Sequence, residues 1–233
     1  MACNSTDTRF FTNSDGSNLY ERFNNTLKNA QYFDALVGYF RTSGFHRLYK
    51  SFDKVEKIRI LVGINVDRQV FDAIETIRQQ KLDFNSQIKI KEQFKEEIKR
   101  EFENSEDTEN VDFGVKKFKE LLQDGKLELR ACREKNIHAK VYITRYNEDM
   151  PIYGSVITGS SNFTENGLNA QYEFNVELKD TPDVKYALER FEELWEKAIP
   201  ISDDYIDAIE TKTWLNEKIT PYEIYLKFLY EYF

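Results

Sequence analysis

The chain has 233 residues, of which 40% are hydrophobic and 32% charged, and its formal net charge is −8. Such a chain can fold around one sizeable core, and its apolar runs are too short to cross a bilayer, which excludes an integral membrane protein. The acidic balance argues against a generally cationic nucleic-acid-binding surface, although it leaves room for a local basic patch.

Cysteine usage and the N-terminal sequence indicate the compartment. The two cysteines, Cys3 and Cys132, are too few for a disulfide framework or a zinc cluster. The first residues do not form a basic segment followed by an apolar one, so we expect no signal peptide. These features favour a cytoplasmic protein in which Cys132 is a small, buried apolar residue.

Helices and strands are predicted to alternate in the first half of the chain. A helix begins at a cap, Ser17 or Asn18, and runs to Ala30, because apolar residues recur there at spacings of three and four. Short apolar runs predict buried strands further on. The elements expected after the first helix are a strand over Phe33–Phe40, a helix from Thr42 or Ser43 to Tyr49, a strand over Lys57–Ile64 and a helix over 70–77.

Charged residues dominate the segment 80–125, which we expect to be a helical insertion. Within it, Lys89–Glu103 carries four apolar residues at spacings of four, which predicts an amphipathic helix with a narrow apolar stripe. Another helix is predicted over Phe113–Leu122, ending at Asp124-Gly125. The many charges are interpreted as a solvated face.

The second half turns to strands and then to helices. Strands are predicted over Leu127–Cys132, Ile137–Thr144, Tyr153–Thr158 and Gln171–Leu178. This alternation of helices and strands indicates an α/β protein built in layers. Residues 182–233 are predicted to be helical with a break at Pro200, and the apolar ending PYEIYLKFLYEYF leads us to expect a piece of a longer polypeptide.

Five side chains of the second half together suit attack on a phosphodiester. His138 and Lys140 share one face of a strand because successive side chains alternate, Ser160 and Asn162 follow the next strand, and Glu173 lies on the polar face of the last one. An imidazole can attack phosphorus, while a lysine, an asparagine and a serine can hold phosphate oxygens. A carboxylate bonded to the second imidazole nitrogen fixes the tautomer. Because fixed cations supply the electrostatics, we expect neither a metal nor a cofactor.

These residues resemble the phospholipase D superfamily, whose motif is HxK followed by GSxN and a later glutamate. His138-Ala139-Lys140 matches HxK, Gly159–Asn162 matches GSxN, and Glu173 follows eleven positions later, as in the superfamily's nucleases. His138 alone would be an ordinary strand histidine, but three separated elements agree in order and spacing. The resemblance implies a phospholipase D-like layered fold, with a mixed central sheet flanked by helices. It also implies a metal-independent phosphodiesterase that works through a phosphohistidine at His138.

The first half of the chain carries a second resemblance. The runs FFTNSDGSNLYERF, FDALVGYFRTSGFHRL and KIRILVGINVD are similar to the phospholipase D-like domain at the front of bacterial Swi/Snf-type helicases and of some restriction-type nucleases. This resemblance implies DNA as substrate or ligand. It also implies a phospholipase D-like domain over 1–180 and a helical extension over 181–233 that leads into a helicase domain.

The sequence contains a single HxK motif, since its other histidine, His46, has no lysine two residues later. Single-motif members of the superfamily bring two copies of the motif together across a two-fold axis. The resemblance therefore implies a homodimer with His138, Lys140, Asn162 and Glu173 of both chains near the axis.

One position departs from the superfamily pattern, which usually has an aspartate five residues after the lysine, where this chain has Arg145. Together with the negative net charge, this departure keeps open a second function, in which the domain binds DNA or a partner for a helicase with little turnover. Lipid hydrolysis is the weakest interpretation, because the sequence offers no basic amphipathic face to a membrane.

Residues close to the motif have simpler interpretations. Ser161 is expected to shape the turn rather than to take part in chemistry. Asn175 and Glu177 are expected to face solvent. For Arg130 and Arg133 the sequence leaves two alternatives open, contact with phosphate groups or an exposed position at the end of a strand.

Overall fold

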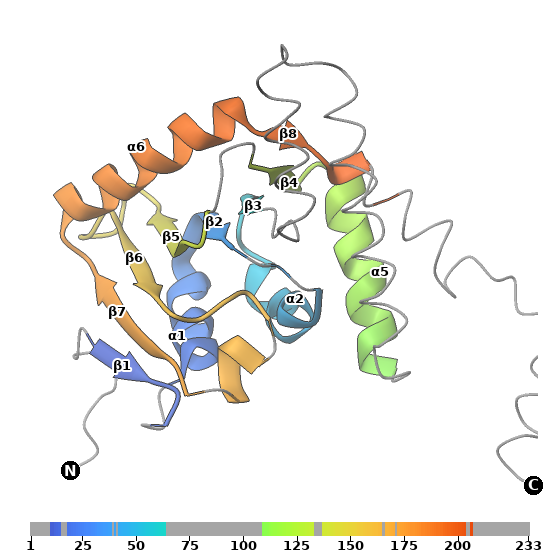
Figure 1. The fold of residues 1–233 in the computed structure, drawn as a ribbon, viewed down its shortest axis with the longest axis horizontal. Helices are drawn as coiled ribbons and strands as arrows, with labels where there is room; N and C mark the ends of the chain where they lie inside the picture. The colour runs from blue at the N-terminus through green and yellow to red at the C-terminus, as the bar shows by residue number, and fades with distance from the viewer. Residues whose placement is uncertain are drawn as a thin grey trace, which may run out of the picture.

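A mixed sheet forms the centre of the molecule, seen here in a computed structural model that describes residues 10–14, 18–38, 40, 42–63, 109–132, 137–164, 166–170, 172–203 and 206. In this part of the chain the sheet has eight strands, in the order β1-β7-β6-β5-β2-β3-β4-β8, and helices lie on both of its faces (Figure 1). The predicted fold class, a layered α/β protein with a mixed central sheet flanked by helices, is confirmed.

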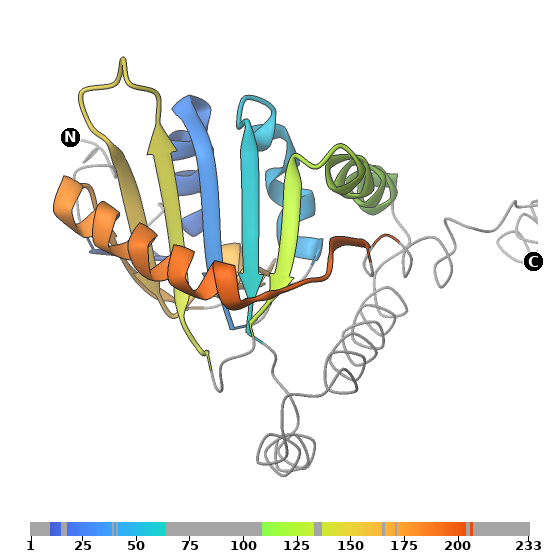
Figure 2. The ribbon, with the colours of Figure 1, turned by 90° about the horizontal axis from the view of Figure 1, so that it is seen from above.

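The strands divide the sheet into a parallel and an antiparallel part. They are β1 (Phe10–Thr12), β2 (Ala30–Val37), β3 (Lys57–Val62), β4 (Leu127–Ala131), β5 (Lys140–Tyr146), β6 (Gly154–Gly159), β7 (Phe174–Leu178) and β8 (Ile199–Pro200). Strands β2, β3 and β4 run parallel to one another, and the other neighbouring pairs are antiparallel. Viewed from above, helix α6 (Thr181–Lys197) crosses the strands (Figure 2).

The helices begin and end close to the predicted residues. They are α1 (Leu19–Thr26), α2 (Thr42–Leu48), α5 (Glu109–Gln123) and α6 (Thr181–Lys197), with short turns η1 (Leu27–Asn29), η2 (Tyr49–Phe52) and the π-helical η3 (Asn166–Ala170). Asn18 caps α1, because its side-chain oxygen accepts the Glu21 N–H at 2.9 Å. The helix stops before Ala30, which instead opens β2. Helix α5 ends just before Gly125, whose φ of +67° suits a residue without Cβ.

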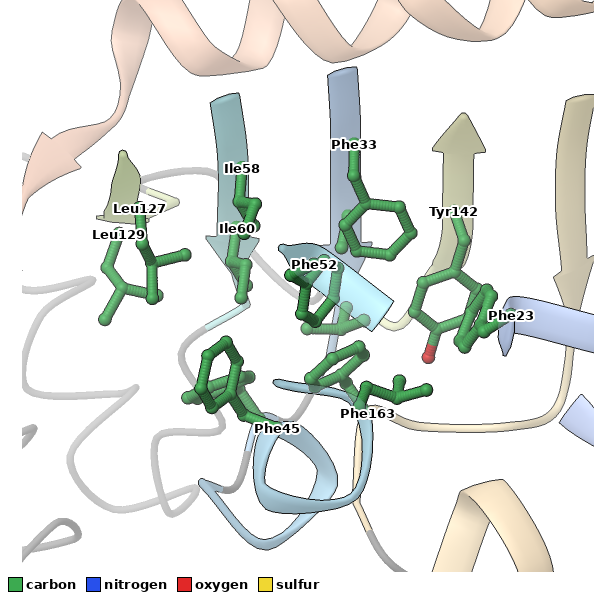
Figure 3. Close-up of a cluster of buried hydrophobic side chains, with 14 of the residues drawn as sticks. Phe23, Phe33, Phe45, Phe52, Ile58, Ile60, Leu127, Leu129, Tyr142 and Phe163 are labelled. Carbon is green, nitrogen blue, oxygen red and sulfur yellow. The ribbon is translucent and has the colours of Figure 1, made fainter. Parts of the chain in front are cut away.

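Both faces of the sheet are buried. Beneath α1, α2 and α5 lies an aromatic-rich cluster in which Phe23, Phe33 and Tyr142 meet (Figure 3), with the Phe23 and Tyr142 ring centroids 5.0 Å apart. Helix α6 covers the other face, where Phe191 and Trp195 pack against apolar strand residues. Because successive strand residues point to opposite faces, both sets of side chains on β5 are removed from water. Tyr142, on the same face of β5 as Lys140, is a core residue.

The C-terminal residues are not wholly helical. Helix α6 confirms the first predicted helix, but Ile199–Pro200 pairs antiparallel with Arg130–Ala131 as β8. Proline lacks an N–H and fits such an edge strand. The predicted helices at 70–77, at 89–103 and beyond 206 lie outside the described residues. None of the helices in the described ranges is long and apolar enough to span a membrane.

Candidate functional site

The five predicted site residues lie at one end of the sheet. His138 comes just before β5, Lys140 is the first residue of β5, and Glu173 comes just before β7. Ser160 and Asn162 follow the last residue of β6. Because β5 and β7 run antiparallel to β6, the start of β5, the end of β6 and the start of β7 meet at the same end of the sheet. The topology thus gathers residues that are up to 35 positions apart in the sequence.

His138 and Lys140 are in direct contact. The Lys140 Nζ lies 2.9 Å from Nδ1 and 3.2 Å from Nε2 of His138, and it donates a hydrogen bond to the His138 carbonyl at 3.1 Å. The imidazole is exposed, whereas Lys140 is only 6% exposed. An exposed imidazole in contact with a largely buried ammonium offers a bound phosphate a ring nitrogen and a positive charge at one place.

Burial changes the acidity of the lysine. Desolvation lowers the pKa of Lys140 below its usual value of 10.5, and the negative charge of Glu173 offsets part of this effect. Only the ammonium form attracts a phosphate, so the attraction is lost as the pH rises through the lowered pKa.

We predict that binding of a phosphodiester weakens on the alkaline side at a pH below 10.5, because Lys140 loses its proton there. The Lys140→Arg variant should keep its charge and hold its KM to higher pH, since a guanidinium stays protonated. The check is KM as a function of pH for both proteins. An identical alkaline rise in KM in the two proteins would contradict the assignment to Lys140.

Glu173 holds Ser160 in this chain. The Ser160 hydroxyl donates to Glu173 Oε2, and the Ser160 Oγ accepts the Phe174 N–H at 3.1 Å. A backbone bond of 3.2 Å from Ser160 N–H to the Phe174 carbonyl closes the contact. The expected bond from the carboxylate to His138 is not seen between these two described residues. Glu173 therefore fixes the position of Ser160, and it is itself buried, with 9% of the residue exposed.

The loop after β6 is anchored from below. Ser161 is fully buried, and it receives hydrogen bonds from Tyr142, whose hydroxyl donates to the Ser161 carbonyl at 2.7 Å, and from Asn175, whose amide donates to Ser161 Oγ at 2.9 Å. Its structural role in the turn agrees with expectation. Asn162 is half-buried, and in the described part of the chain its Oδ1 accepts no hydrogen bond.

The expectation that Asn175 and Glu177 face solvent is wrong. They are 1% and 4% exposed, and they point with Glu173 into the face covered by α1. There Arg22 of α1 donates to Glu177 Oε2 at 2.8 Å. The opposite side of β7 carries the exposed side chain of Phe174. The polar side of this strand is buried because α1 supplies a charged partner.

Two glycines leave room for the HxK segment, and neither was among the site residues predicted from the sequence. A Cβ on Gly63 would lie 2.4 Å from the Ile137 carbonyl, and a Cβ on Gly38 would lie 3.3 Å from His138 Cα. The Gly38 N–H also donates to the Ala139 carbonyl at 2.9 Å. The sequence signal that could have identified these glycines is their position directly after the apolar runs that form β2 and β3.

We predict that Gly63→Ala moves the backbone at Ile137, because the new methyl group and the carbonyl oxygen cannot both keep their places. The displacement should lower phosphodiester turnover more than it lowers the melting temperature. Gly125→Ala is the comparison: nothing lies within 4 Å of its Cβ position, so it should reduce stability through its positive φ and leave turnover per folded molecule unchanged. Equal turnover in the two variants would contradict the prediction.

Arg145, which stands where the superfamily usually has aspartate, lies on the α6 face, away from Lys140. Its Nη2 donates to Asp34 of β2 at 3.0 Å, and Asp34 also accepts from Arg59 Nε at 2.5 Å. Arg59 in turn makes two bonds of 3.0 and 2.7 Å with Glu192 of α6. The acidic group at this place thus comes from the neighbouring strand. The departure changes how α6 is tied to the sheet and leaves the five site residues untouched.

The remaining basic and sulfur candidates are structural or outside the described residues. Arg130 donates to the Trp195 carbonyl at 2.9 Å and lies over that ring, so it fastens α6. Cys132 is buried, as expected. Arg133 and the side chain of His46 lie outside what the structure describes. Within the described ranges, no group of three or more His, Cys, Asp or Glu side chains is placed to hold a metal ion.

The fold and this motif geometry agree with a family comparison. Residues 23–195 match the family profile described as "Cardiolipin synthase, PLD-like domain". The chain therefore belongs to the phospholipase D-like family. A search of curated proteins finds no match.

Several solved structures are similar to this chain at low sequence identity. Nuc from Salmonella typhimurium, a phospholipase D family member, is 13% identical, with 82% of this chain and 96% of that chain covered and a TM-score of 0.47. NucT from Helicobacter pylori is also 13% identical, with the same coverage and a TM-score of 0.43. Phosphatidylserine synthase from Haemophilus influenzae is 14% identical over 95% of this chain and 44% of its own, with a TM-score of 0.50. At such identities the similarity concerns the fold alone.

Proposed function

We propose that this protein is a metal-independent phosphodiesterase that cleaves DNA through His138. The observation that carries the proposal is the contact between an exposed imidazole and the Lys140 ammonium, 2.9 Å apart, at the sheet end that also holds Ser160, Asn162 and Glu173. Membership of the phospholipase D-like family supports the reaction class. The resemblance of the first half to domains at the front of bacterial helicases supports DNA as the substrate.

In the proposed reaction, His138 acts as the nucleophile. An unprotonated ring nitrogen attacks phosphorus and forms a P–N bond while the P–O bond to the leaving sugar oxygen breaks. Lys140 and the amide of Asn162 hold the non-bridging oxygens, whose negative charge grows in the transition state. A second imidazole gives its proton to the leaving oxygen. Water then attacks phosphorus and returns a proton to that imidazole, and the P–N bond breaks to release a phosphate monoester.

The second imidazole is proposed to come from a second copy of the chain. A homodimer with a two-fold axis at the site would place the two copies of His138 on opposite sides of one phosphate. In the full-length protein, this dimeric domain would lie ahead of a helicase, which would deliver DNA to it.

Cleavage of three substrates in the presence of a chelator tests the proposed reaction and its substrate together. We expect cleavage of single- or double-stranded DNA and of bis(p-nitrophenyl) phosphate, but no release of headgroups from phospholipid vesicles. Cleavage of the small diester with no cleavage of DNA would refute DNA as the substrate. Headgroup release from vesicles would transfer the proposal to lipids, and loss of all activity with the chelator would refute the metal-independent reaction.

The shared site can be tested by mixing wild type with an equal amount of the His138→Ala variant. If both histidines are needed and the subunits exchange, about a quarter of the dimers keep two wild-type chains, so activity at constant total protein should fall to about a quarter of the wild-type value. A site completed within one chain would retain about half. Light scattering on the same samples reports the oligomeric state.

One contact favours a second function, phosphate-dependent DNA binding without turnover. Among the described residues, Glu173 is bonded to Ser160 and not to His138, so this carboxylate does not support the positive charge of the imidazole. A binding module predicts that DNA affinity falls steeply with salt, because bound counterions are released, and that no strand is cut. Measurement of binding and cleavage on the same DNA at two salt concentrations separates the two functions.

A further inference from the structure

The inner serine of the GSxN loop is held by a pair of buried polar side chains. Ser161 is completely buried, whereas Ser160 on one side of it is exposed and Asn162 on the other side is half-buried. The loop therefore carries Ser160 and Asn162 on either side of a residue that points inward. Whatever fixes Ser161 also fixes the spacing between Ser160 and Asn162.

The two anchors come from the strands on either side of β6. Tyr142 of β5 donates its hydroxyl to the Ser161 carbonyl at 2.7 Å, and Asn175 of β7 donates its amide to Ser161 Oγ at 2.9 Å. Each anchor lies two positions after a proposed site residue on the same face of its strand: Tyr142 follows Lys140, and Asn175 follows Glu173. The two contacts therefore link β5 and β7 to Ser161, which follows the end of β6.

Further contacts show that the loop has little freedom. The hydroxyl of Thr158 donates to the Lys140 carbonyl at 2.9 Å, which ties the end of β6 to the start of β5. The Phe163 ring, directly after Asn162, is fully buried and stacks on Phe40 with centroids 5.6 Å apart. A Cβ on Gly159 would lie 2.4 Å from Asn175 Oδ1. The loop is thus tightly packed at Gly159, at Ser161 and at Phe163.

The two anchoring side chains, Tyr142 and Asn175, keep their hydrogen-bond donors when the pH changes. Burial, together with the nearby charge of Glu173, raises the pKa of the Tyr142 phenol well above its usual value, so the hydroxyl stays protonated and keeps its donor. The Asn175 amide cannot ionise at all. Both anchors therefore keep their hydrogen-bond donors over the pH range in which a lysine titrates.

We propose that Tyr142 and Asn175 are positioning residues, which act through Ser161 to hold Ser160 and Asn162 at the correct distance from Lys140. This inference rests on the proposed phosphodiesterase function. Both side chains are buried, each residue being 1% exposed, so neither is placed to contact substrate. Because a reacting group misplaced by about an ångström can lose about a hundredfold in rate, small movements of the loop are expected to act on turnover more than on folding.

The test compares Tyr142→Phe, Asn175→Leu and Ser161→Ala with Tyr146→Phe, which removes the same hydroxyl from the other end of β5. For bis(p-nitrophenyl) phosphate we expect each of the first three variants to lower kcat by about tenfold to a hundredfold, with a melting temperature close to that of Tyr146→Phe. The double variant Asn175→Leu, Ser161→Ala should have a kcat no lower than that of either single variant, because the two changes remove the same hydrogen bond. A kcat within twofold of wild type in Tyr142→Phe and Asn175→Leu would overturn the inference.

Amide hydrogen exchange gives a second measurement that does not depend on turnover. We expect exchange at Ser160, Ser161 and Asn162 to be faster in Tyr142→Phe and Asn175→Leu than in wild type, and unchanged in Tyr146→Phe. A wild-type protein without activity would refute the proposed function while leaving this measurement to decide on the anchors. Unchanged exchange in both anchor variants would overturn the inference even if the wild type is active.

Discussion

Replacement of His138 by alanine is expected to lower phosphodiester turnover by at least about a thousandfold, because the variant has no nucleophile to form the P–N bond. The imidazole is exposed, so its loss should leave the melting temperature close to that of wild type. The measurement is single-turnover cleavage of an end-labelled DNA and of bis(p-nitrophenyl) phosphate, with folding checked by circular dichroism. An acid-labile, alkali-stable phosphoprotein, trapped by rapid quenching, should form in wild type and be missing in the variant.

The matched control is His46→Ala, which removes the other histidine of the chain. Its turnover should equal that of wild type, since His46 has no lysine two positions later and carries no part of the motif. Activity that survives His138→Ala, or that is lost equally in both histidine variants, would show that His138 is not the nucleophile.

The largest effect on stability is expected from Glu177→Ala. Glu177 and Arg22 are both 3% exposed at their side chains and form a 2.8 Å ion pair between β7 and α1. Removal of the carboxylate would leave the guanidinium buried without this counter-charge, which costs about 3–5 kcal/mol of unfolding free energy. Urea unfolding followed by fluorescence gives the difference.

Two further variants identify the cause of that loss. Lys179 also lies 3.6 Å from Glu177, but its side chain is 42% exposed, so Lys179→Ala should cost at most about 1 kcal/mol. The double variant Arg22→Met, Glu177→Leu removes both charges and should recover most of the stability of wild type. If Glu177→Ala proves no more harmful than Lys179→Ala, the buried pair does not stabilise the fold in this way.

The motif residues and most element positions could be predicted because their signals are local. His138 and Lys140 are two residues apart, and the fixed spacing to Asn162 and Glu173 follows from strand and turn lengths. Apolar periodicity located α1 and α6, and the turn at Gly125 located the end of α5. Such patterns depend on neighbours a few positions away, which the sequence displays directly.

The buried polar side of β7 could not be predicted, because its partner is far away in the sequence. Glu177 is buried only because Arg22 meets it from 155 positions earlier, and alternation in a strand does not say which side faces the deeper core. Strand β8 could not be predicted for a related reason. Two residues carry no period, and Ile199–Pro200 is a strand only because β4 lies beside it. The contact between Glu173 and Ser160 likewise depends on tertiary geometry.

The sheet order has a consequence for which part of the chain the site depends on. All five site residues lie between positions 138 and 173, at or beside the ends of strands β5, β6 and β7, where each strand pairs with the next along the chain. The parallel strands β3 and β4, by contrast, are joined by the long connection 63–126. Because the entropy of closing a loop grows only slowly with its length, the long separation of β3 and β4 along the chain adds little to the cost of pairing them. The five site residues instead depend on the pairing of three consecutive strands, and the connection between β3 and β4 contributes none of them.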